Sequence, residues 1–313
     1  MRIFDCSISS ESNKLHDSNS LGPPQNDIMS DLRKYSELYG VEFVDDYKQS
    51  DVIITNTVYP DYILKYSDMN KIPRVKRMDG ICSFSMNDLK HRNEPLNTAA
   101  LQSDKVIFIS EYSRNSYHEL YGGELKNECV VLNNVDDDVF KPLNKEKGDF
   151  LLCSSATNWS RKDKRFQSII DLALRISDNM ILIGQCDFAL PSNILSVGYI
   201  SDYERINNIL NMCSVFVSPF FRCAGSKVTL QAMKVGLPIL YTSSGGLPEL
   251  VGDGGVMITD HNDIDFLDKV PELDTAHVLD RYHYLKNNYN SYKSNLPRYQ
   301  ETIKKYFDEI LFK

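Results

Sequence analysis

The 313-residue chain has a single tryptophan, no cysteine pair in Cys-x-x-Cys spacing and no long hydrophobic run. Its seven cysteines are odd in number and several lie within apolar runs, which predicts reduced, mostly buried thiols. No run approaches the roughly 18 to 20 apolar residues of a membrane span. The residues after Met1 contain no long apolar stretch, so we expect no signal peptide and a cytoplasmic location.

Positive charge is also scarce, because 43 acidic residues outnumber 35 basic ones and give a formal net charge of -8. This balance gives no support for a polyphosphate partner held by bulk electrostatics. We interpret two local basic clusters as solvated surface charge, with a local basic groove as the alternative. The clusters are Lys71, Arg74, Lys76 and Arg77, and then Arg161, Lys162, Lys164 and Arg165.

Short apolar runs alternate with longer amphipathic stretches along the whole chain, which predicts parallel sheets covered by helices on both faces. The expected fold class is therefore α/β, with two Rossmann-like doubly wound domains. Strands are predicted at Arg2–Cys6, Glu42–Val44, Asp51–Thr55, Arg74–Met78, Lys105–Ile109, Glu128–Leu132, Asp149–Ser154, Met180–Ile183, Ile194–Val197, Val215–Ser218 and Ile239–Tyr241. Helices are predicted at Gln25–Tyr39, Met86–Ala100, Ser113–Leu120, Lys164–Ile176, Asp202–Asn211 and Ser226–Lys234, and residues 279–313 have a helical pattern.

A polar stretch around residues 133–148 is the expected interdomain linker. We expect an N-terminal domain over residues 1–145, a C-terminal domain over 146–290, and a final helical segment over 291–313. Doubly wound domains bind ligands at the carboxyl ends of their strands. If the two edges face each other, the ligand site lies between the domains, where small-molecule sites are common.

The most informative segment follows the predicted strand Val215–Ser218. Ser226 is a good helix N-cap, so the free amides of the following helix are expected to form an anion site. Gly245 and Gly246 follow the next strand, where glycine lets the backbone approach a ligand closely. On spacing alone, an ordinary strand-helix-strand unit with turn glycines explains the segment equally well.

The sequence of this segment resembles the donor half of retaining glycosyltransferases of the family 4 type, which have the GT-B fold. The resemblance rests on Gln231-Ala-Met-Lys-Val-Gly-Leu-Pro and Gly245-Gly-Leu-Pro-Glu249. Further family-like pieces occur in order over most of residues 20–260. They are Gly22-Pro at the first-domain glycine loop, Ser110-Glu-Tyr-Ser-Arg, Asn133-Asn-Val-Asp-Asp-Asp-Val-Phe-Lys-Pro, and Gly198-Tyr199-Ile-Ser.

The resemblance implies a nucleotide-sugar site in the C-terminal domain, with the diphosphate over the start of the helix. Both glutamates of the family signature are replaced, the first by Cys223 and the second by Gln231. In the family the first contacts the donor sugar and the second holds the ribose hydroxyls; the Gln231 amide still hydrogen-bonds a ribose, whereas a thiol is a poor sugar ligand. The implied donor-binding set is Gly22, Gly198, Tyr199, Cys223, Gly225, Ser226, Lys227, Gln231, Gly245, Gly246 and Glu249.

The family also places an arginine and a lysine on the donor diphosphate. Lys164, expected to open a helix, matches the lysine; Trp159 stands at the arginine position, and Arg161 is the replacement. Such cations offset the charge that the leaving diphosphate gains in the transition state. Asp79 follows the strand Arg74–Met78 and is a candidate for binding the acceptor hydroxyl, with an ordinary glycine-turn aspartate as the alternative. The Asp136–Asp138 run is interpreted as a domain-closing turn rather than a metal site.

The resulting hypothesis is transfer of a sugar from a nucleotide diphosphate-sugar, UDP- or GDP-linked, to an acceptor hydroxyl, with retention and without a metal. No cofactor is expected. The first domain would bind the acceptor, and the C-terminal helical stretch Pro297–Phe312 is expected to pack back on that domain. Two alternatives are a degenerate nucleotide-sugar-binding protein and a GT-B enzyme of another reaction type, such as an epimerase. The acceptor is open between glycan, lipid, protein and small molecule, with a modified DNA base as a lesser option.

Overall fold

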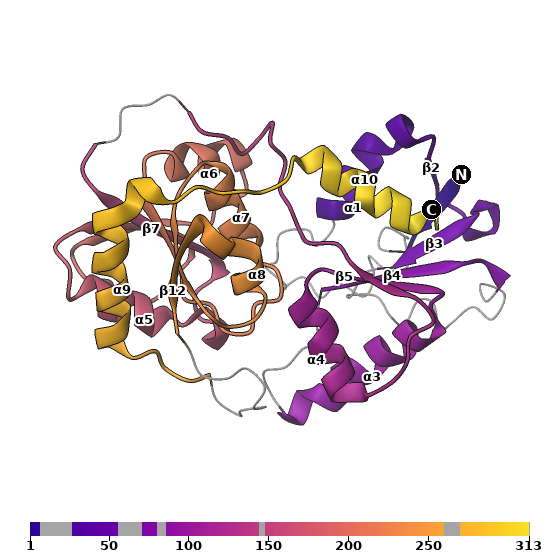
Figure 1. Cartoon of the computed structure of the whole chain (residues 1–313), viewed down its shortest axis with the longest axis horizontal. Helices are drawn as coiled ribbons and strands as arrows, with labels where there is room; N and C mark the ends of the chain where they lie inside the picture. The colour runs from indigo at the N-terminus through magenta and orange to yellow at the C-terminus, as the bar shows by residue number, and fades with distance from the viewer. Residues whose placement is uncertain (7–26, 56–70, 80–85, 144–147, 260–269, 313) are drawn as a thin grey trace. The chain divides into compact units, whose positions relative to one another are not determined.

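The computed structural model describes residues 1–6, 27–55, 71–79, 86–143, 148–259 and 270–312. The chain divides into two compact units, Met1–Leu132 with Gln300–Lys313, and Asn133–Tyr299. Within the described residues, each unit contains one six-stranded sheet. The chain thus passes between the units twice, once at residues 132–133 and once at 299–300 (Figure 1).

The sheet of the first unit is entirely parallel and has the order β2-β1-β3-β4-β5-β6. Every predicted strand of this region is confirmed as a strand. The strands are β1 (Arg2–Asp5), β2 (Glu42–Val44), β3 (Val52–Thr55), β4 (Arg74–Met78), β5 (Lys105–Phe108) and β6 (Glu128–Val130). The helices are α1 (Asp27–Tyr35), α3 (Met86–Gln102), α4 (Glu111–Tyr121) and α10 (Tyr299–Ile310), with short 3-10 turns η2 (Ser36–Tyr39) and η3 (Tyr47–Gln49).

The C-terminal helix α10 is fastened to this first sheet by polar contacts. Lys105 Nζ lies 2.8 Å from the Glu309 carboxylate, and the Tyr306 hydroxyl donates to the Val131 carbonyl at 3.2 Å. The helical pattern of residues 279–313 is interrupted in the structure. The structure has α9 (Thr275–Asn288), the 3-10 turn η7 (Tyr289–Ser291) and then α10, with non-helical residues 292–298 between them. Pro297 disfavours helix at the residue before it, which explains the interruption.

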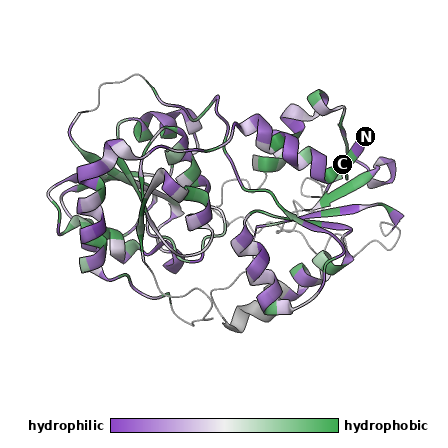
Figure 2. Ribbon diagram, viewed as in Figure 1, coloured by the Kyte–Doolittle hydropathy of each residue, from purple (hydrophilic) through white to green (hydrophobic). Residues whose placement is uncertain are grey.

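Strand β4 carries most of the first basic cluster, and its hydrophilic residues stand out within the sheet in Figure 2. The expectation of solvated surface charge is wrong here, because Arg74, Lys76 and Arg77 are only 6%, 0% and 3% exposed. Burial outweighs the favourable charges of Asp79 and Cys6, and lowers the pKa of Lys76 from its usual 10.5 to about 8. Burial of the charged Lys76 ammonium therefore destabilises the folded protein.

Replacing Lys76 with methionine is expected to raise the free energy of unfolding at pH 7 by about 3 kcal/mol, because the buried ammonium is removed. The unfolded chain keeps the lysine proton up to about pH 10.5, whereas the folded protein releases it near pH 8. Wild-type stability relative to the variant therefore rises between these values, and the gap between the two proteins closes by about pH 10.5. Denaturant unfolding of both proteins from pH 7 to 10.5, with Lys71→Met as an exposed control, measures this. A gap independent of pH would refute it.

The sheet of the second unit is also entirely parallel, in the order β12-β11-β10-β7-β8-β9. Its strands are β7 (Leu151–Asn158), β8 (Asn179–Gln185), β9 (Ile194–Gly198), β10 (Val215–Ser218), β11 (Ile239–Thr242) and β12 (Gly255–Ile258). The helices are α5 (Phe166–Ala173), α6 (Tyr203–Leu210), α7 (Lys227–Lys234), α8 (Leu247–Val251) and α9, with 3-10 turns η5 (Lys162–Lys164) and η6 (Gly252–Gly254). Helices α5 and α9 lie on one face and α6 and α7 on the other (Figure 1).

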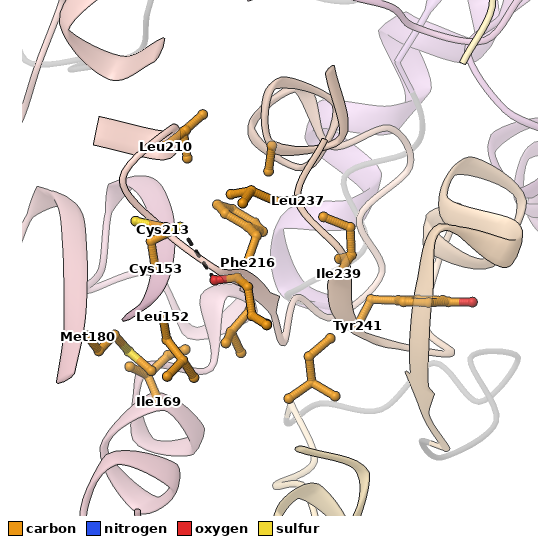
Figure 3. Packing of buried hydrophobic residues seen from close by; sticks show 14 of the residues in the cluster. Leu152, Cys153, Ile169, Met180, Leu210, Cys213, Phe216, Leu237, Ile239 and Tyr241 are labelled. Atoms are coloured by element: carbon orange, nitrogen blue, oxygen red, sulfur yellow. Dashed lines mark hydrogen bonds between the residues drawn. The ribbon is translucent and has the colours of Figure 1, made fainter. Parts of the chain in front are cut away.

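The core of this unit forms where the central strands meet these helices. Leu152 of β7, Ile169 of α5 and Met180 of β8 pack together on one face of the sheet (Figure 3). The fully buried Phe216 of β10 points to the opposite face, toward Leu237 (Figure 3). Tyr241 of β11 points its hydroxyl away from this cluster and donates to the Gly252 carbonyl at 3.1 Å. Burial on both faces explains why these strands are continuous apolar runs rather than alternating ones.

Candidate functional site

Strands β7 and β10 are neighbours in the second sheet, although the chain places β8, β9 and α6 between them. From this pair the strand order runs outward in opposite directions, which makes it the topological switch point of the sheet. Open parallel sheets bind ligands outside the carboxyl ends of the strands at such a point. The two loops that leave β7 and β10 there, residues 159–165 and 219–226, hold many of the candidate donor residues.

The loop after β7 differs from the prediction, because Lys164 does not open a helix. Lys162–Lys164 form the 3-10 turn η5, Arg165 adopts a left-handed conformation (φ 48°), and α5 starts only at Phe166. The Arg165 guanidinium donates to the carbonyls of Pro271 at 3.0 Å and Pro219 at 3.4 Å. These bonds to distant segments hold Arg165 outside the helix and bury it, so this member of the second basic cluster is not surface charge either.

Lys164 lies at the switch point itself. Its ammonium is 2.9 Å from the Asp163 carboxylate and 4.7 Å from the centre of the Phe220 ring, which belongs to the loop after β10. Arg161 contacts the same carboxylate through two nitrogens, each at 3.0 Å. Burial would raise the pKa of Asp163, but Lys164 and Arg161 outweigh it and lower that pKa below its usual value. Two cations share one carboxylate, so this group of three carries net positive charge.

Trp159, which replaces the arginine of the family pattern, is a core residue. It is 1% exposed, and its indole nitrogen donates to the Ile183 carbonyl of β8 at 3.0 Å. Arg161 is two residues further on and its side chain is 58% exposed. At the position where the family pattern has an arginine that binds the diphosphate, this chain therefore has a residue that packs in the core. Arg161 is an exposed cation of the same loop.

The predicted helix cap at Ser226 is confirmed. Its hydroxyl accepts from the backbone amide of Thr229 at 3.3 Å and from the Thr229 hydroxyl at 2.7 Å. The Thr229 hydroxyl is also 3.0 Å from the Ser218 hydroxyl at the end of β10. This buried network ties the start of α7 to the end of its strand, so the amino end of α7 lies at the carboxyl edge of the sheet. The unpaired amides at such an end attract anions.

Two glycine positions lock the loop after β10 to the loop after β11. The Gly246 amide donates to the Cys223 carbonyl at 2.9 Å, and the Arg222 amide donates to the Ser244 hydroxyl at 2.7 Å. Gly245 has a φ of 69°, and a Cβ placed on it would lie 2.6 Å from both the nitrogen and the oxygen of Cys223. Gly245 is therefore required for contact between two protein backbones, whereas Gly246 contributes only its backbone amide to that contact.

The other donor candidates of this unit lie on the surrounding elements. Gln231 is 7% exposed in the middle of α7, whereas Cys223 and Lys227 are partly exposed. Gly198 ends β9 with a φ of 71°, and Tyr199 after it is 49% exposed. Glu249 lies in the first turn of α8 and is exposed. The structure thus brings Cys223, Gly225 and Ser226 into one loop next to Gly245 and Gly246, with the rest on neighbouring elements.

In the first unit, Asp79 directly follows β4 and forms an ion pair with Arg77. Arg77 is 3% exposed and its Nε lies 3.4 Å from the Tyr306 hydroxyl of α10. The carboxylate raises the pKa of Arg77 despite burial. This buried arginine–tyrosine pair has no signal in the sequence, because a charged strand such as β4 is typical of an exposed strand. Gly22 lies outside the described residues.

Within the described residues, no group of three or more histidine, cysteine or acidic side chains is placed to hold a metal ion. In the Asp136–Asp138 turn, Asp137 forms an ion pair with Lys234, and Asp136 accepts from the Asp138 amide at 2.9 Å. The described cysteines are free thiols. None of the described helices has the length and apolar character needed to cross a membrane.

Comparison with known proteins places part of this site in a family. The family model for glycosyl transferases group 1 matches residues 173–274, which include every donor candidate from Gly198 to Glu249. A curated relative, an uncharacterized glycosyltransferase from Methanocaldococcus jannaschii, is 26% identical over 186 residues. The match covers 56% of this chain and 51% of the relative, so it spans about half of that relative's length.

Among solved structures, sucrose-phosphate synthase from Thermosynechococcus elongatus aligns with a TM-score of 0.68 at 14% identity, covering 94% of this chain and 82% of that chain. The Anabaena protein HepE, solved with UDP and glucose, aligns with a TM-score of 0.66 at 16% identity, covering 100% of this chain and 99% of that chain. Both alignments span the two units, so the fold prediction is confirmed. The chain has the GT-B fold, and its residues 173–274 are similar to the glycosyl transferases group 1.

Proposed function

We propose that the protein is a glycosyltransferase that moves a sugar from a nucleotide diphosphate-sugar to an acceptor hydroxyl. The observation that carries this proposal is the switch point of the second unit, where the net positive group around Lys164 and the capped amino end of α7 occur on adjacent loops. Both features favour a bound diphosphate. HepE contains UDP and glucose and has the same fold, which supports UDP as the first donor nucleotide to test.

The chemistry follows from the charge at this site. When the bond between the sugar carbon and the diphosphate oxygen breaks, that oxygen gains negative charge, and a preorganised cation lowers the barrier. Lys164 and the amides of α7 supply this stabilisation, so we propose transfer without a metal ion. The acceptor oxygen forms the new bond, and the family resemblance supports retention of configuration. Asp79, in the first unit, is proposed to bind the acceptor hydroxyl.

The test is a panel of UDP-, GDP- and ADP-sugars. Binding is measured by calorimetry and hydrolysis by release of the nucleoside diphosphate. We expect micromolar binding of at least one donor and slow hydrolysis of its sugar in the absence of acceptor. The proposal would be contradicted if the protein neither bound nor hydrolysed any sugar of the panel.

A second candidate function, nucleotide-sugar binding without transfer, is favoured by the two replaced glutamates. The Cys223 backbone is locked against Gly245 and Gly246, and Gln231 is buried in α7, so both changes are built into the site. Introducing Cys223→Glu and Gln231→Glu together distinguishes the two functions. If wild type binds the donor but is inert, and the double variant turns it over, the binding function is correct.

A further inference from the structure

Asn133 is the first residue of the second unit after the chain leaves the first. Its side chain is 7% exposed, and its amide nitrogen donates to the Gly225 carbonyl at 3.2 Å, across 92 positions of sequence. Gly225 directly precedes Ser226, the N-cap of α7. A residue of the interunit crossing thus holds the loop on which a donor diphosphate is proposed to rest.

The bond acts on a particular peptide group. The Gly225 carbonyl and the Ser226 amide belong to the same planar trans peptide, so their directions are opposed. When Asn133 holds the carbonyl, the Ser226 amide points the opposite way, away from Asn133. Ser226 N–H is one of the amides at the end of α7 that have no partner within the helix. By holding the Gly225 carbonyl, Asn133 therefore sets the direction of the Ser226 amide, which is the group proposed to bind the anion.

The far end of α7 is held as well. Lys234, the last residue of the helix, is 8% exposed at its side chain, forms an ion pair with Asp137 and donates to the Pro297 carbonyl at 2.8 Å. The other Asp137 oxygen accepts from the Tyr299 amide at 2.7 Å. The carboxyl end of α7 is therefore held by contacts that do not involve Gly225.

We propose that Asn133 is a positioning residue for the donor diphosphate, acting by holding the Gly225–Ser226 peptide so that the Ser226 amide is aimed at the ligand. This inference rests on the proposed function, since it names a residue that serves the same donor site. Because the coupling is reciprocal, a bound diphosphate stabilises the hydrogen bond between the Asn133 side chain and the Gly225 carbonyl. Donor binding is thereby linked to the segment through which the chain passes between its units.

The neighbouring residue offers a matched control. Asn134 is 5% exposed, and its side-chain nitrogen donates to the Pro297 carbonyl at 3.0 Å. Asn134→Ala removes a buried side-chain donor of the same kind, together with the bond that its Oδ1 accepts from the Val135 amide at 2.9 Å. Neither bond involves the donor loop. Asn133→Ala removes the bond to Gly225, and Asn133→Asp keeps the size of the side chain but replaces its donor with an acceptor.

The first measurement is hydrogen–deuterium exchange of residues 222–229 in the ligand-free proteins. The second is calorimetric affinity for UDP and GDP, with uridine and guanosine as probes that lack phosphate. We expect Asn133→Ala to speed exchange in this loop and to weaken binding of the nucleoside diphosphate about fivefold, as for loss of one hydrogen bond, with a larger loss for Asn133→Asp. Nucleoside affinity stays unchanged, and Asn134→Ala behaves as wild type in both measurements.

Unchanged exchange in Asn133→Ala would overturn the inference, as would an equal loss of affinity for nucleoside and nucleoside diphosphate, or an equal loss in Asn134→Ala. If wild type binds neither UDP nor GDP nor any donor of the panel, the proposed function fails and takes this inference with it. The exchange measurement separates the two failures, because it reports the Asn133–Gly225 bond without any ligand.

Discussion

Lys164→Gln is expected to lower the kcat of sugar transfer by about 100-fold, with a smaller change in KM. The lysine lies at the switch point and its charge counts most when the leaving diphosphate becomes more negative, so the loss falls on the transition state. The fold of the turn is expected to survive, because Asp163 keeps both of its bonds to Arg161. Steady-state kinetics with the donor that wild type accepts measures the effect.

Lys162→Gln is the matched control for this change, since Lys162 belongs to the same 3-10 turn but is exposed. It should leave kcat within a factor of two and the unfolding midpoint unchanged, whereas Lys164→Gln is expected to lower the midpoint because it removes the ion pair with Asp163. Arg161→Gln should lose less than Lys164→Gln, because the Arg161 side chain is 58% exposed and its field is screened by water. Equal losses in Lys162→Gln and Lys164→Gln would mean that only the general charge of the turn matters.

The site illustrates which features are predictable from sequence. The cap at Ser226 was predicted because capping depends on one residue type and the next three amides, all local in the chain. The strands were predicted where both faces are buried and the apolar run is continuous. Strand β12 and helix α8 were not predicted: Gly255 allows β12 to approach the Ile239 carbonyl of β11, and that pairing is long-range.

The errors share a cause, which is contact between distant segments. Lys164 was expected to open a helix, but Arg165 is held in a left-handed conformation by carbonyls 54 and 106 positions away. The charged strand β4 is typical of a solvated strand, yet α10 closes over Arg77 from the other end of the chain. The bond from Asn133 to Gly225 has no local signal either. Contacts between segments far apart in the sequence therefore explain why local patterns failed at these positions.

Gly245→Ala is expected to abolish measurable nucleotide binding and to destabilise the second unit by about 4 kcal/mol. The left-handed backbone at this position costs an alanine about 1 to 2 kcal/mol. Overpacking adds about 1 to 3 kcal/mol, because the new Cβ would lie 2.6 Å from two Cys223 backbone atoms and 2.9 Å from the Arg222 carbonyl carbon. Backbone neighbours do not rotate away as a flexible side chain does. The loops separate instead, and the Gly246–Cys223 hydrogen bond is lost with them.

Gly236→Ala separates the two contributions to this effect. Gly236, at the end of α7, has a φ of 83°, but its added Cβ would meet only Pro142 Cγ, at 4.0 Å. This variant therefore carries the backbone strain alone and should lose about 1 to 2 kcal/mol while binding nucleotide as wild type does. Denaturant unfolding and calorimetry on both variants measure the difference. If Gly245→Ala unfolds no more easily than Gly236→Ala and keeps its nucleotide affinity, the interlocked loops do not form the donor site.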